Sequence, residues 1–482
     1  MPKLFKRDYY AQGRREAFRR RRMRRLGRAV GSRAHWRVRA VLWSFAVLAG
    51  LAVVLFSELA DLSLNTFFLL YQNFPWLCLL LTPLIAVVTV WLTRHFFPGS
   101  EGSGIPQVIA ATRISGSNKP VGALISLRIV FGKIFCGSLA LLGGMSAGRE
   151  GPSVQVASSI MHAAHRFLPH SRVIRKSDLV LAGGAAGIAA AFNTPLAGIV
   201  FAIEELGRRL ETRTSGVLIS TIIVSGIVAI ALLGNYNHFG RVIVTGVHLN
   251  IVMPVIVIGL FCGLLGGLFS RILLWPMRQP QHLIWRWRRQ YPLYFAAGCG
   301  LLIAIIGLMV QGASFGSGYI ISQQLISGQT DLPWYAVLAR YVATLLTYFS
   351  GIPGGIFAPS LAVGAGVGGQ LAPLFDPALG SNPFFILGMA AFLAAVTQSP
   401  ITAAVIVMEM VDNHSMVVSL MAVSLIAKMV SARLGPELYQ QLALGFMPPY
   451  QEQQGTGLAK KDEQNGVQGK TKGKGKADEE LS

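Results

Sequence analysis

The chain has 482 residues and a net charge of +22, and 52% of its residues are hydrophobic while only 13% are charged. A soluble domain would carry about 25% charged residues, so this composition excludes an ordinary soluble protein and predicts an all-α polytopic membrane protein. The positive charge does not indicate a nucleic-acid partner, because residues 1–40 alone hold 15 Lys and Arg and the excess is not spread along the chain.

Residues 1–40 are a basic N-terminal segment that includes a run of four arginines at 19–22. Beside a first membrane span, such a segment predicts a cytoplasmic arm that contacts anionic membrane lipid. It is too long for the basic part of a signal peptide, and the apolar run after it has no clear small-residue cleavage site. We therefore expect no cleavable leader.

Four apolar runs are long enough to cross a membrane, which takes about 20 residues. These runs are 41–60, 76–92, 251–269 and 295–310. We expect residues 41–446 to form the transmembrane domain and residues 447–482, rich in Gly, Lys, Glu and Gln, to form a disordered cytoplasmic tail. The four cysteines lie in or beside apolar segments without metal-ligand spacing, so we expect them to pack: Cys78, Cys136, Cys262 and Cys299.

The first loop of interest spans residues 99–106 and reads Gly-Ser-Glu-Gly-Ser-Gly-Ile-Pro. Its backbone N–H groups and hydroxyls could face an anion, but a plain turn between helices also explains the pattern. Residues 109–120 read as a polar loop. Lys133 follows in the apolar stretch 121–145, where it could raise the local potential for an anion, pair with a helix C-terminus or snorkel to the interface.

The second loop, Gly148-Arg149-Glu150-Gly151-Pro152-Ser153, places a carboxylate between two glycines at what reads as the start of a helix. A helix N-terminus attracts an anion, because its N–H groups are free and its dipole is positive there. We therefore interpret Glu150 as the occupant of a site that a permeating anion would otherwise fill, and we expect it to leave when protonated.

The basic connector over residues 162–178 holds His162, His165 and His170. Their spacing could suggest a metal site, but no further ligand accompanies them, so we favour an interfacial loop and expect no bound metal. The chain also shows no nucleophile-and-base set, no phosphate loop and no acid pair with metal ligands. We therefore expect no catalytic residues and no enzyme activity.

Residues 183–205 and 388–410 are similar at an offset of 205, which aligns Pro195 with Pro400 in the middle of each segment. Two related halves, about 41–234 and 251–446, with Pro-broken segments in corresponding places predict a transporter-type fold. We expect the broken helices to point their N-termini at a shared site near the membrane midplane. Similarity alone leaves inverted and parallel repeats open.

The repeat also separates the acidic residues that have a counterpart in the other half from those that have none. Glu204 aligns with Glu409, so we expect an architectural role in both halves, such as accepting backbone N–H bonds. Glu205 aligns with Met410, and Glu150 has no acidic counterpart in the other half. These two unmatched acids are the candidates for proton carriage, because a carboxyl group in a poorly hydrated site can load and unload a proton.

Three motifs, taken in order, resemble the filter motifs of the CLC chloride channel and transporter family: Gly102-Ser103-Gly104-Ile105-Pro106, Gly148-Arg149-Glu150-Gly151-Pro152 and Gly355-Ile356-Phe357-Ala358-Pro359. The resemblance extends roughly over residues 40–445. It implies an inverted-repeat fold, a homodimer with one pore per subunit, a selectivity filter built from the three motifs, and chloride and protons as substrates without a cofactor.

The resemblance also implies roles for single residues in chloride binding. Ser103 and Tyr439 would bind the central chloride through their hydroxyls, and Ile356 and Phe357 through their backbone N–H groups. Ser103, where other members have Pro, is similar to the chloride-preferring members. Tyr439 follows Gly435-Pro436-Glu437-Leu438, one residue more than in close relatives, and an interfacial aromatic anchor is the alternative for it.

For protons, the resemblance implies that Glu150 is the external gate and proton acceptor and that Glu205 is the internal proton-transfer acid. An acid at the position of Glu205 favours H+/Cl− exchange, while a passive voltage-gated-type chloride channel of the same fold is the alternative. Gln107 stands where many relatives carry an acid, which alters the inner charge environment. We expect a multi-pass protein of the bacterial inner membrane with both termini in the cytoplasm.

Overall fold

The structure is a computed structural model that describes residues 33–115, 121–168, 174–207, 215–234, 239, 249–328, 332–377 and 380–447. Within these ranges the chain is almost entirely helical, and the extended backbone makes only two isolated bridges. The predictions for most of the basic arm, for His170 and for the tail from residue 448 onward lie outside the described residues.

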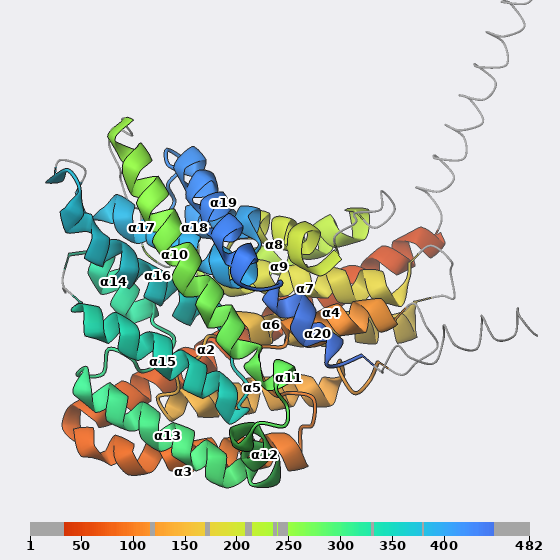
Figure 1. The fold of residues 1–482 in the computed structure, drawn as a ribbon. Coiled ribbons are helices and arrows are strands. Elements are labelled where there is room, and N and C mark those ends of the chain that lie inside the picture. Colours follow the sequence, from red (N-terminus) through yellow and green to blue (C-terminus); the bar gives the residue numbers. More distant parts are fainter. Residues whose placement is uncertain are drawn as a thin grey trace, which may run out of the picture.

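The first half begins with the long helix α2 and ends with α9 (Figure 1). They are α2 (Arg33–Asn73), η1 (Pro75–Leu77), α3 (Cys78–His95), α4 (Ile105–Ile114), α5 (Leu127–Leu142), α6 (Glu150–Ala163), η2 (Ala164–Phe167), α7 (Lys176–Phe192), α8 (Pro195–Phe201), η3 (Ala202–Gly207) and α9 (Ser215–Leu233).

The second half begins with a long helix and ends with a short one. Its elements are η4 (Leu249–Ile251), α10 (Val252–Leu273), α11 (Trp275–Arg278), α12 (Leu283–Gln290), α13 (Pro292–Met309), α14 (Tyr319–Ile326), α15 (Trp334–Ser350), α16 (Phe357–Leu371), η5 (Ala372–Leu374), α17 (Asn382–Thr397), α18 (Pro400–Met410), α19 (Val417–Leu434) and α20 (Leu438–Leu444).

Among the described residues, six helical stretches are long and apolar enough to cross a membrane. The four predicted runs lie in α2, η1 with α3, α10 and α13, so these predictions are confirmed, and α9 and α19 add two spans that were not predicted. The predicted loop over 109–120 is wrong for its first part, because residues 109–114 continue the apolar helix α4. The predicted loop after residue 162 also starts too early, since His162 still belongs to α6 and His165 to η2.

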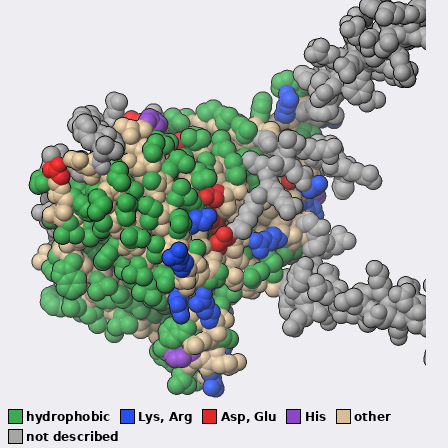
Figure 2. Space-filling model, turned by 45° about the horizontal axis from the view of Figure 1, so that its top comes forward, with side chains coloured by type: hydrophobic (Ala, Val, Ile, Leu, Met, Phe, Trp, Pro, Cys, Tyr) green, Lys and Arg blue, Asp and Glu red, His purple; other side chains and the backbone are tan. Residues whose placement is uncertain are grey.

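Large apolar side chains cover much of the outer surface. On α2 the exposed residues Leu48, Leu55, Leu62 and Leu69 recur every seven residues, which places them along one face of the helix. Figure 2 shows a face formed largely by hydrophobic side chains, with Lys and Arg gathered toward one part of it. A surface of this kind suits contact with lipid tails and supports an integral multi-pass membrane protein.

The two halves repeat the same packing. Helix α2 packs on α9 as α10 packs on α19, and the pair α6–α7 corresponds to the pair α16–α17. The breaks correspond too, since Asn193 after α7 and Gln398 after α17 both adopt the left-handed conformation, with φ of 57° and 61°. The predicted repeat with broken helices is therefore confirmed.

Glu204 and Glu409 show how the halves are related. Glu204 accepts hydrogen bonds from the backbone N–H groups of Ile401 (3.3 Å) and Thr402 (2.7 Å) at the start of α18. Glu409 accepts from Leu196 (3.2 Å) and Ala197 (2.7 Å) at the start of α8. Each acid thus caps the broken helix of the opposite half, which confirms the predicted architectural role. Such a reciprocal exchange is what a two-fold axis between two repeats produces.

Small residues let the helices before each break approach closely. A Cβ atom added to Gly187 on α7 would lie 2.6 Å from the carbonyl oxygen of Ser153 on α6. One added to Gly388 on α17 would collide with the carbonyl oxygen of Gly364 on α16. This close packing in both halves sets the position of the N-termini of α6 and α16.

Candidate functional site

Backbone hydrogen bonds join the three glycine motifs into one junction. Gly102 donates to the carbonyl of Ile352 (3.0 Å), and Gly354 donates back to that of Gly102 (3.1 Å). Gly148 and Gly355 exchange two hydrogen bonds of 2.7 Å each. The third motif therefore lies between the other two, although more than 200 residues separate it from each along the chain.

Three helices begin at this junction. Helix α4 starts after Gly104, whose φ of 95° only glycine adopts readily, α6 starts at Glu150 and α16 starts at Phe357. The predicted helix start at the second motif is confirmed, with Pro152 as the third helical residue. The N-terminal turns supply free N–H groups and positive dipole ends. The junction is thus suited to hold negative charge.

Gly151 allows the motifs to meet. A Cβ atom at this position would collide with the hydroxyl of Ser103, and it would lie 3.0 Å from the carbonyl oxygen of Ser103 and 3.4 Å from the Cα of Gly355. Real Cβ atoms essentially never approach backbone atoms much more closely than this. The absence of a side chain at Gly151 therefore brings Ser103 next to the third motif.

Glu150 is fully buried at the start of α6. Its Oε1 accepts a hydrogen bond of 2.8 Å from the hydroxyl of Tyr319 on α14. The other oxygen, Oε2, lies beside Gly148, because a Cβ atom added to Gly148 would collide with it. The same added atom would lie 3.3 Å from the backbone nitrogen of Ala358, so Oε2 lies near the start of α16. The carboxylate thus occupies the positive N-terminal turn of α16, as the anion-site interpretation requires.

Tyr439 is fully buried on α20, which packs against α4. Its ring meets that of Phe357 edge-to-face, with 5.9 Å between centroids, and its hydroxyl interacts with that of Ser103. Neither hydroxyl completes a hydrogen bond of normal geometry within the described residues. The alternative of an exposed interfacial anchor for Tyr439 is therefore wrong, since the structure brings it to the first and third motifs.

Ile356 and Phe357 are both buried, with 2% of each residue exposed, and they form the N-cap and the first residue of α16. The ring of Phe357 stacks on that of Phe192 at 6.2 Å and meets that of Phe201 edge-to-face at the same distance. These rings make an apolar wall beside the junction. Such a wall keeps water away from the α16 N-terminus and strengthens its interaction with charge.

Glu205 is buried in η3 with 4% of its surface exposed. Its carboxylate accepts a hydrogen bond from the hydroxyl of Ser399, and its backbone carbonyl accepts one of 2.9 Å from the side chain of Gln440 on α20. The carboxylate also interacts electrostatically with the hydroxyl of Tyr439. The π-helical backbone turns Glu205 toward α20 while the adjacent Glu204 caps α18.

Lys133 lies behind the first motif. It is fully buried on α5, and its Nζ donates to the carbonyl oxygens of Gly102 (2.5 Å) and Glu101 (3.5 Å). Snorkelling to the interface is therefore wrong for Lys133. Gln107 donates to the same Glu101 carbonyl at 2.7 Å, so the residue that departs from the family pattern also supports the loop.

Sequence reasoning missed Tyr319, the residue that hydrogen-bonds Glu150. It follows a Gly- and Ser-rich turn, and its helix of eight residues is too short for a clear periodic pattern. A signal was present in the sequence, because Gly102-Ser103-Gly104 recurs as Gly316-Ser317-Gly318 directly before Tyr319. The alignment of Tyr319 with the residue after Gly104 would have marked it as a residue near the junction.

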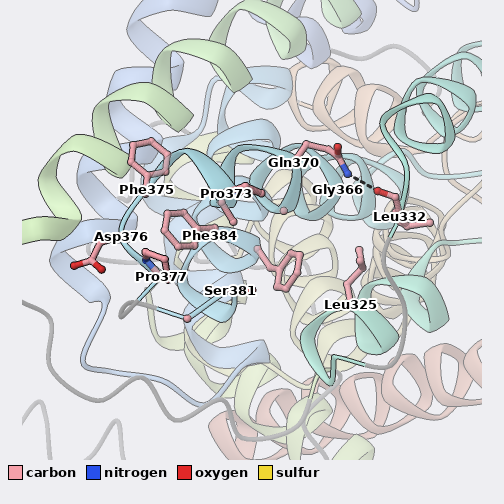
Figure 3. A pocket seen from close by; sticks show the side chains of 14 residues that line it. Leu325, Leu332, Gly366, Gln370, Pro373, Phe375, Asp376, Pro377, Ser381 and Phe384 are labelled. Atoms are coloured by element: carbon pink, nitrogen blue, oxygen red, sulfur yellow. Dashed lines mark hydrogen bonds between the residues drawn. The ribbon is translucent and has the colours of Figure 1, made fainter.

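A separate cavity of about 450 Å³ lies among α14, α16 and α17 (Figure 3). Its polar side chains are Gln370, Asp376 and Ser381, and Gln370 donates a hydrogen bond to the carbonyl of Leu332. None of its lining residues belongs to the three motifs. The motif junction is therefore distinct from this pocket.

The sequence profile of a family described as "Voltage gated chloride channel" matches residues 84–432, most of the described chain. This chain belongs to the CLC family. Among solved structures, a slow cyanobacterial Cl−/H+ antiporter is 25% identical, with a TM-score of 0.73 over 85% of this chain and 98% of the other. The predicted family and the CLC-type fold are thus confirmed.

Two further solved structures share the CLC fold. A CLC-type fluoride/proton antiporter is 22% identical, with a TM-score of 0.71 over 86% of this chain and 99% of the other. A eukaryotic CLC transporter is also 22% identical, with a TM-score of 0.68 over 86% of this chain and 76% of the other. At this identity the likeness concerns the fold alone.

Proposed function

We propose that this CLC protein exchanges chloride for protons across the membrane, with Glu150 as the external gate and proton acceptor. The observation that carries the proposal is the position of the Glu150 carboxylate, which is fully buried at the N-terminal turn of α16. A carboxylate and a halide cannot share this place, because like charges repel strongly where little water is present. Protonation removes the charge of Glu150 and frees the place for an anion.

The proposed chloride ligands are the hydroxyls of Ser103 and Tyr439 and the backbone N–H groups of Ile356 and Phe357. Both hydroxyls are buried and lack a hydrogen bond of normal geometry within the described residues. Buried polar groups nearly always have a partner, and a chloride ion accepts from two hydroxyls and from helix N-terminal N–H groups together. This donor set fits an anion, and the three motifs that form it are the proposed selectivity filter.

Glu205 is the proposed internal proton-transfer acid. Its backbone carbonyl accepts a hydrogen bond from Gln440, the residue after Tyr439, and Ser399 donates a hydrogen bond to its carboxylate. Buried acids inside membrane proteins are energetically expensive and usually serve the transported ion or proton. The 25% identical relative named as a Cl−/H+ antiporter also favours exchange.

The alternative function is a passive chloride channel. The same filter would serve a channel, so the geometry of the anion site does not separate the two functions. The buried Glu205 favours exchange, because acidic residues inside the membrane commonly serve as proton relays. We propose no cofactor and no enzyme activity, since the chemistry amounts to ion binding and one proton transfer.

Reconstitution into liposomes tests the proposal by measuring chloride and proton flux together. The wild-type protein should move protons against their gradient when a chloride gradient drives it. Glu150→Gln should retain chloride flux and lose proton movement. Glu205→Gln should also lose proton movement, although the residues of its selectivity filter are unchanged. A wild-type protein that passes chloride without protons would support the channel, and proton pumping by Glu150→Gln would exclude the gate assignment.

We also propose a homodimer with one pore per subunit in the bacterial inner membrane, with both termini in the cytoplasm. The exposed apolar helix faces suit a second subunit as well as lipid. The basic arm over residues 1–40 fits the cytoplasmic side and anionic lipid, and nothing in its composition calls for nucleic acid. Residues 447–482 are the proposed cytoplasmic tail.

A further inference from the structure

The hydroxyl of Tyr319 donates a hydrogen bond of 2.8 Å to Oε1 of Glu150. The two residues are 169 positions apart and belong to opposite halves of the repeat. A donor aimed at a buried carboxylate stabilises its charged form in that position, and it does so more strongly than a donor at a neutral acceptor. The contact therefore acts on the residue that we propose as the gate.

The turn that carries Tyr319 is held rigidly by Arg340 on α15. Its guanidinium donates to the backbone carbonyls of Ala313 (3.1 and 2.5 Å), Phe315 (3.1 Å) and Gly316 (3.1 Å). A Cβ atom added to Gly318, directly before Tyr319, would lie 2.8 Å from this guanidinium. The start of α14 thus has little freedom to move, which fixes the position of the phenol.

We infer that Tyr319 is a positioning residue that latches the charged Glu150 side chain, through its hydrogen bond, at the N-terminal turn of α16. This inference rests on the proposed function, since it concerns the same gate. In the latched state the carboxylate resists displacement by an incoming anion. The latch weakens once Glu150 takes up a proton, because the hydrogen bond then loses its charged partner.

Other groups also face the Glu150 carboxylate. Arg149, the residue directly before Glu150, interacts with the carboxylate, and so does the backbone N–H of Ala358 on α16. The Tyr439 hydroxyl on α20 acts on it through space, without a hydrogen bond. Arg149 is partly neutralised by an ion pair of 2.6 Å with Asp61. These contacts remain when the Tyr319 hydroxyl is removed, so the loss of the latch weakens the charged position without abolishing it.

The test is Tyr319→Phe, which keeps the ring against Phe239 (5.8 Å between centroids) and removes only the hydroxyl. Loss of a hydrogen bond to a charged group corresponds to about a tenfold change in an equilibrium. We therefore expect chloride turnover at neutral pH to rise by about tenfold. The midpoint of the acid activation of chloride flux should move about one unit toward higher pH, because the charged carboxylate is stabilised less.

The ratio of chloride to protons should stay at the wild-type value in Tyr319→Phe, because Glu150 still accepts and releases a proton. The matched control is Tyr341→Phe, which removes another hydroxyl, one that donates to the carbonyl of Leu265 at 3.1 Å. This variant should keep the wild-type pH midpoint. In the background of Glu150→Gln, Tyr319→Phe should change chloride flux by less than about twofold, because no charged carboxylate remains to be latched.

The inference is overturned if Tyr319→Phe keeps the wild-type midpoint, or if it changes flux equally in the Glu150→Gln background. Failure of the proposed function would look different, since wild-type protein would then move no protons. If Tyr319→Phe does not fold, 3-fluorotyrosine at position 319 keeps the ring and strengthens the donor. It should shift the midpoint toward lower pH, and an unchanged midpoint would again overturn the inference.

Discussion

The packing of the three filter motifs depends on the absence of a side chain at Gly151. A Cβ atom at this position would meet both Ser103 and Gly355, so the close packing of the second motif against the first and the third requires a glycine here. Alanine is otherwise favoured over glycine inside a helix by about 1 kcal/mol. A glycine in the first turn of α6 is therefore explained by the packing of the site and not by helix formation.

We predict that Gly151→Ala damages anion binding more than it damages the fold. The added methyl group must displace the Ser103 hydroxyl, and such overpacking costs about 1–3 kcal/mol. The dissociation constant for chloride should therefore rise about tenfold or more, which isothermal titration of the purified protein can measure.

The matched control for this prediction is Gly216→Ala on α9, where an added Cβ has no described atom within 4 Å. This variant should bind chloride as the wild type does. Equal affinities for Gly151→Ala and the wild type would mean that the motifs tolerate separation, and the assignment of Ser103 as a ligand would then fail.

The broken helices α8 and α18 are tied together by the exchanged caps of Glu204 and Glu409. Each of these helices starts at a Pro after a left-handed residue, so its first N–H groups have no partner within the preceding helix. A carboxylate from the opposite half satisfies two of them in each case. The two breaks therefore stabilise each other.

We predict that Glu204→Ala and Glu409→Ala lower the stability of the protein by similar amounts, about 1–3 kcal/mol each, because each leaves two helix N–H groups unpaired. Thermal unfolding in detergent should show comparable decreases in melting temperature, and the ratio of chloride to protons should not change. Glu205→Ala serves as the contrast, since it should lose proton coupling with a smaller effect on stability. Loss of coupling in Glu204→Ala without destabilisation would assign that acid to the proton path instead.

How far the sequence predicts these elements depends on whether the signal is local. The start of α6 at Glu150 and the breaks at Pro195 and Pro400 were predictable, because Gly and Pro restrict the backbone wherever they occur. The contact of Tyr319 with Glu150 was not predictable, because the repeated Gly-Ser-Gly turn marks the position of Tyr319 but not the partner of its hydroxyl in the other half. The apolar helix α9 was overlooked although its composition is clearly span-like.

The residues proposed for the gate and for chloride binding all come from a single chain. The first half supplies Ser103 and Glu150, and the second half supplies Phe357 and Tyr439. Backbone bonds between Gly148 and Gly355 close the site within that chain. The outer faces of α2, α9 and α19 carry exposed apolar side chains and no member of the filter. In the proposed dimer we therefore expect each pore to be complete within one subunit and to work independently.

This independence leads to a prediction for assemblies that mix wild-type and Glu150→Gln subunits. If each chain carries its own pore and its own gate, proton movement should fall linearly with the fraction of Glu150→Gln subunits, while chloride flux persists. Coexpression with two affinity tags isolates the mixed dimer, and flux assays in liposomes should show half of the wild-type proton movement per protein. A mixed dimer with no proton movement, or with the full wild-type value, would mean that the subunits share one gate. Such a result would contradict the closure of the site within one chain.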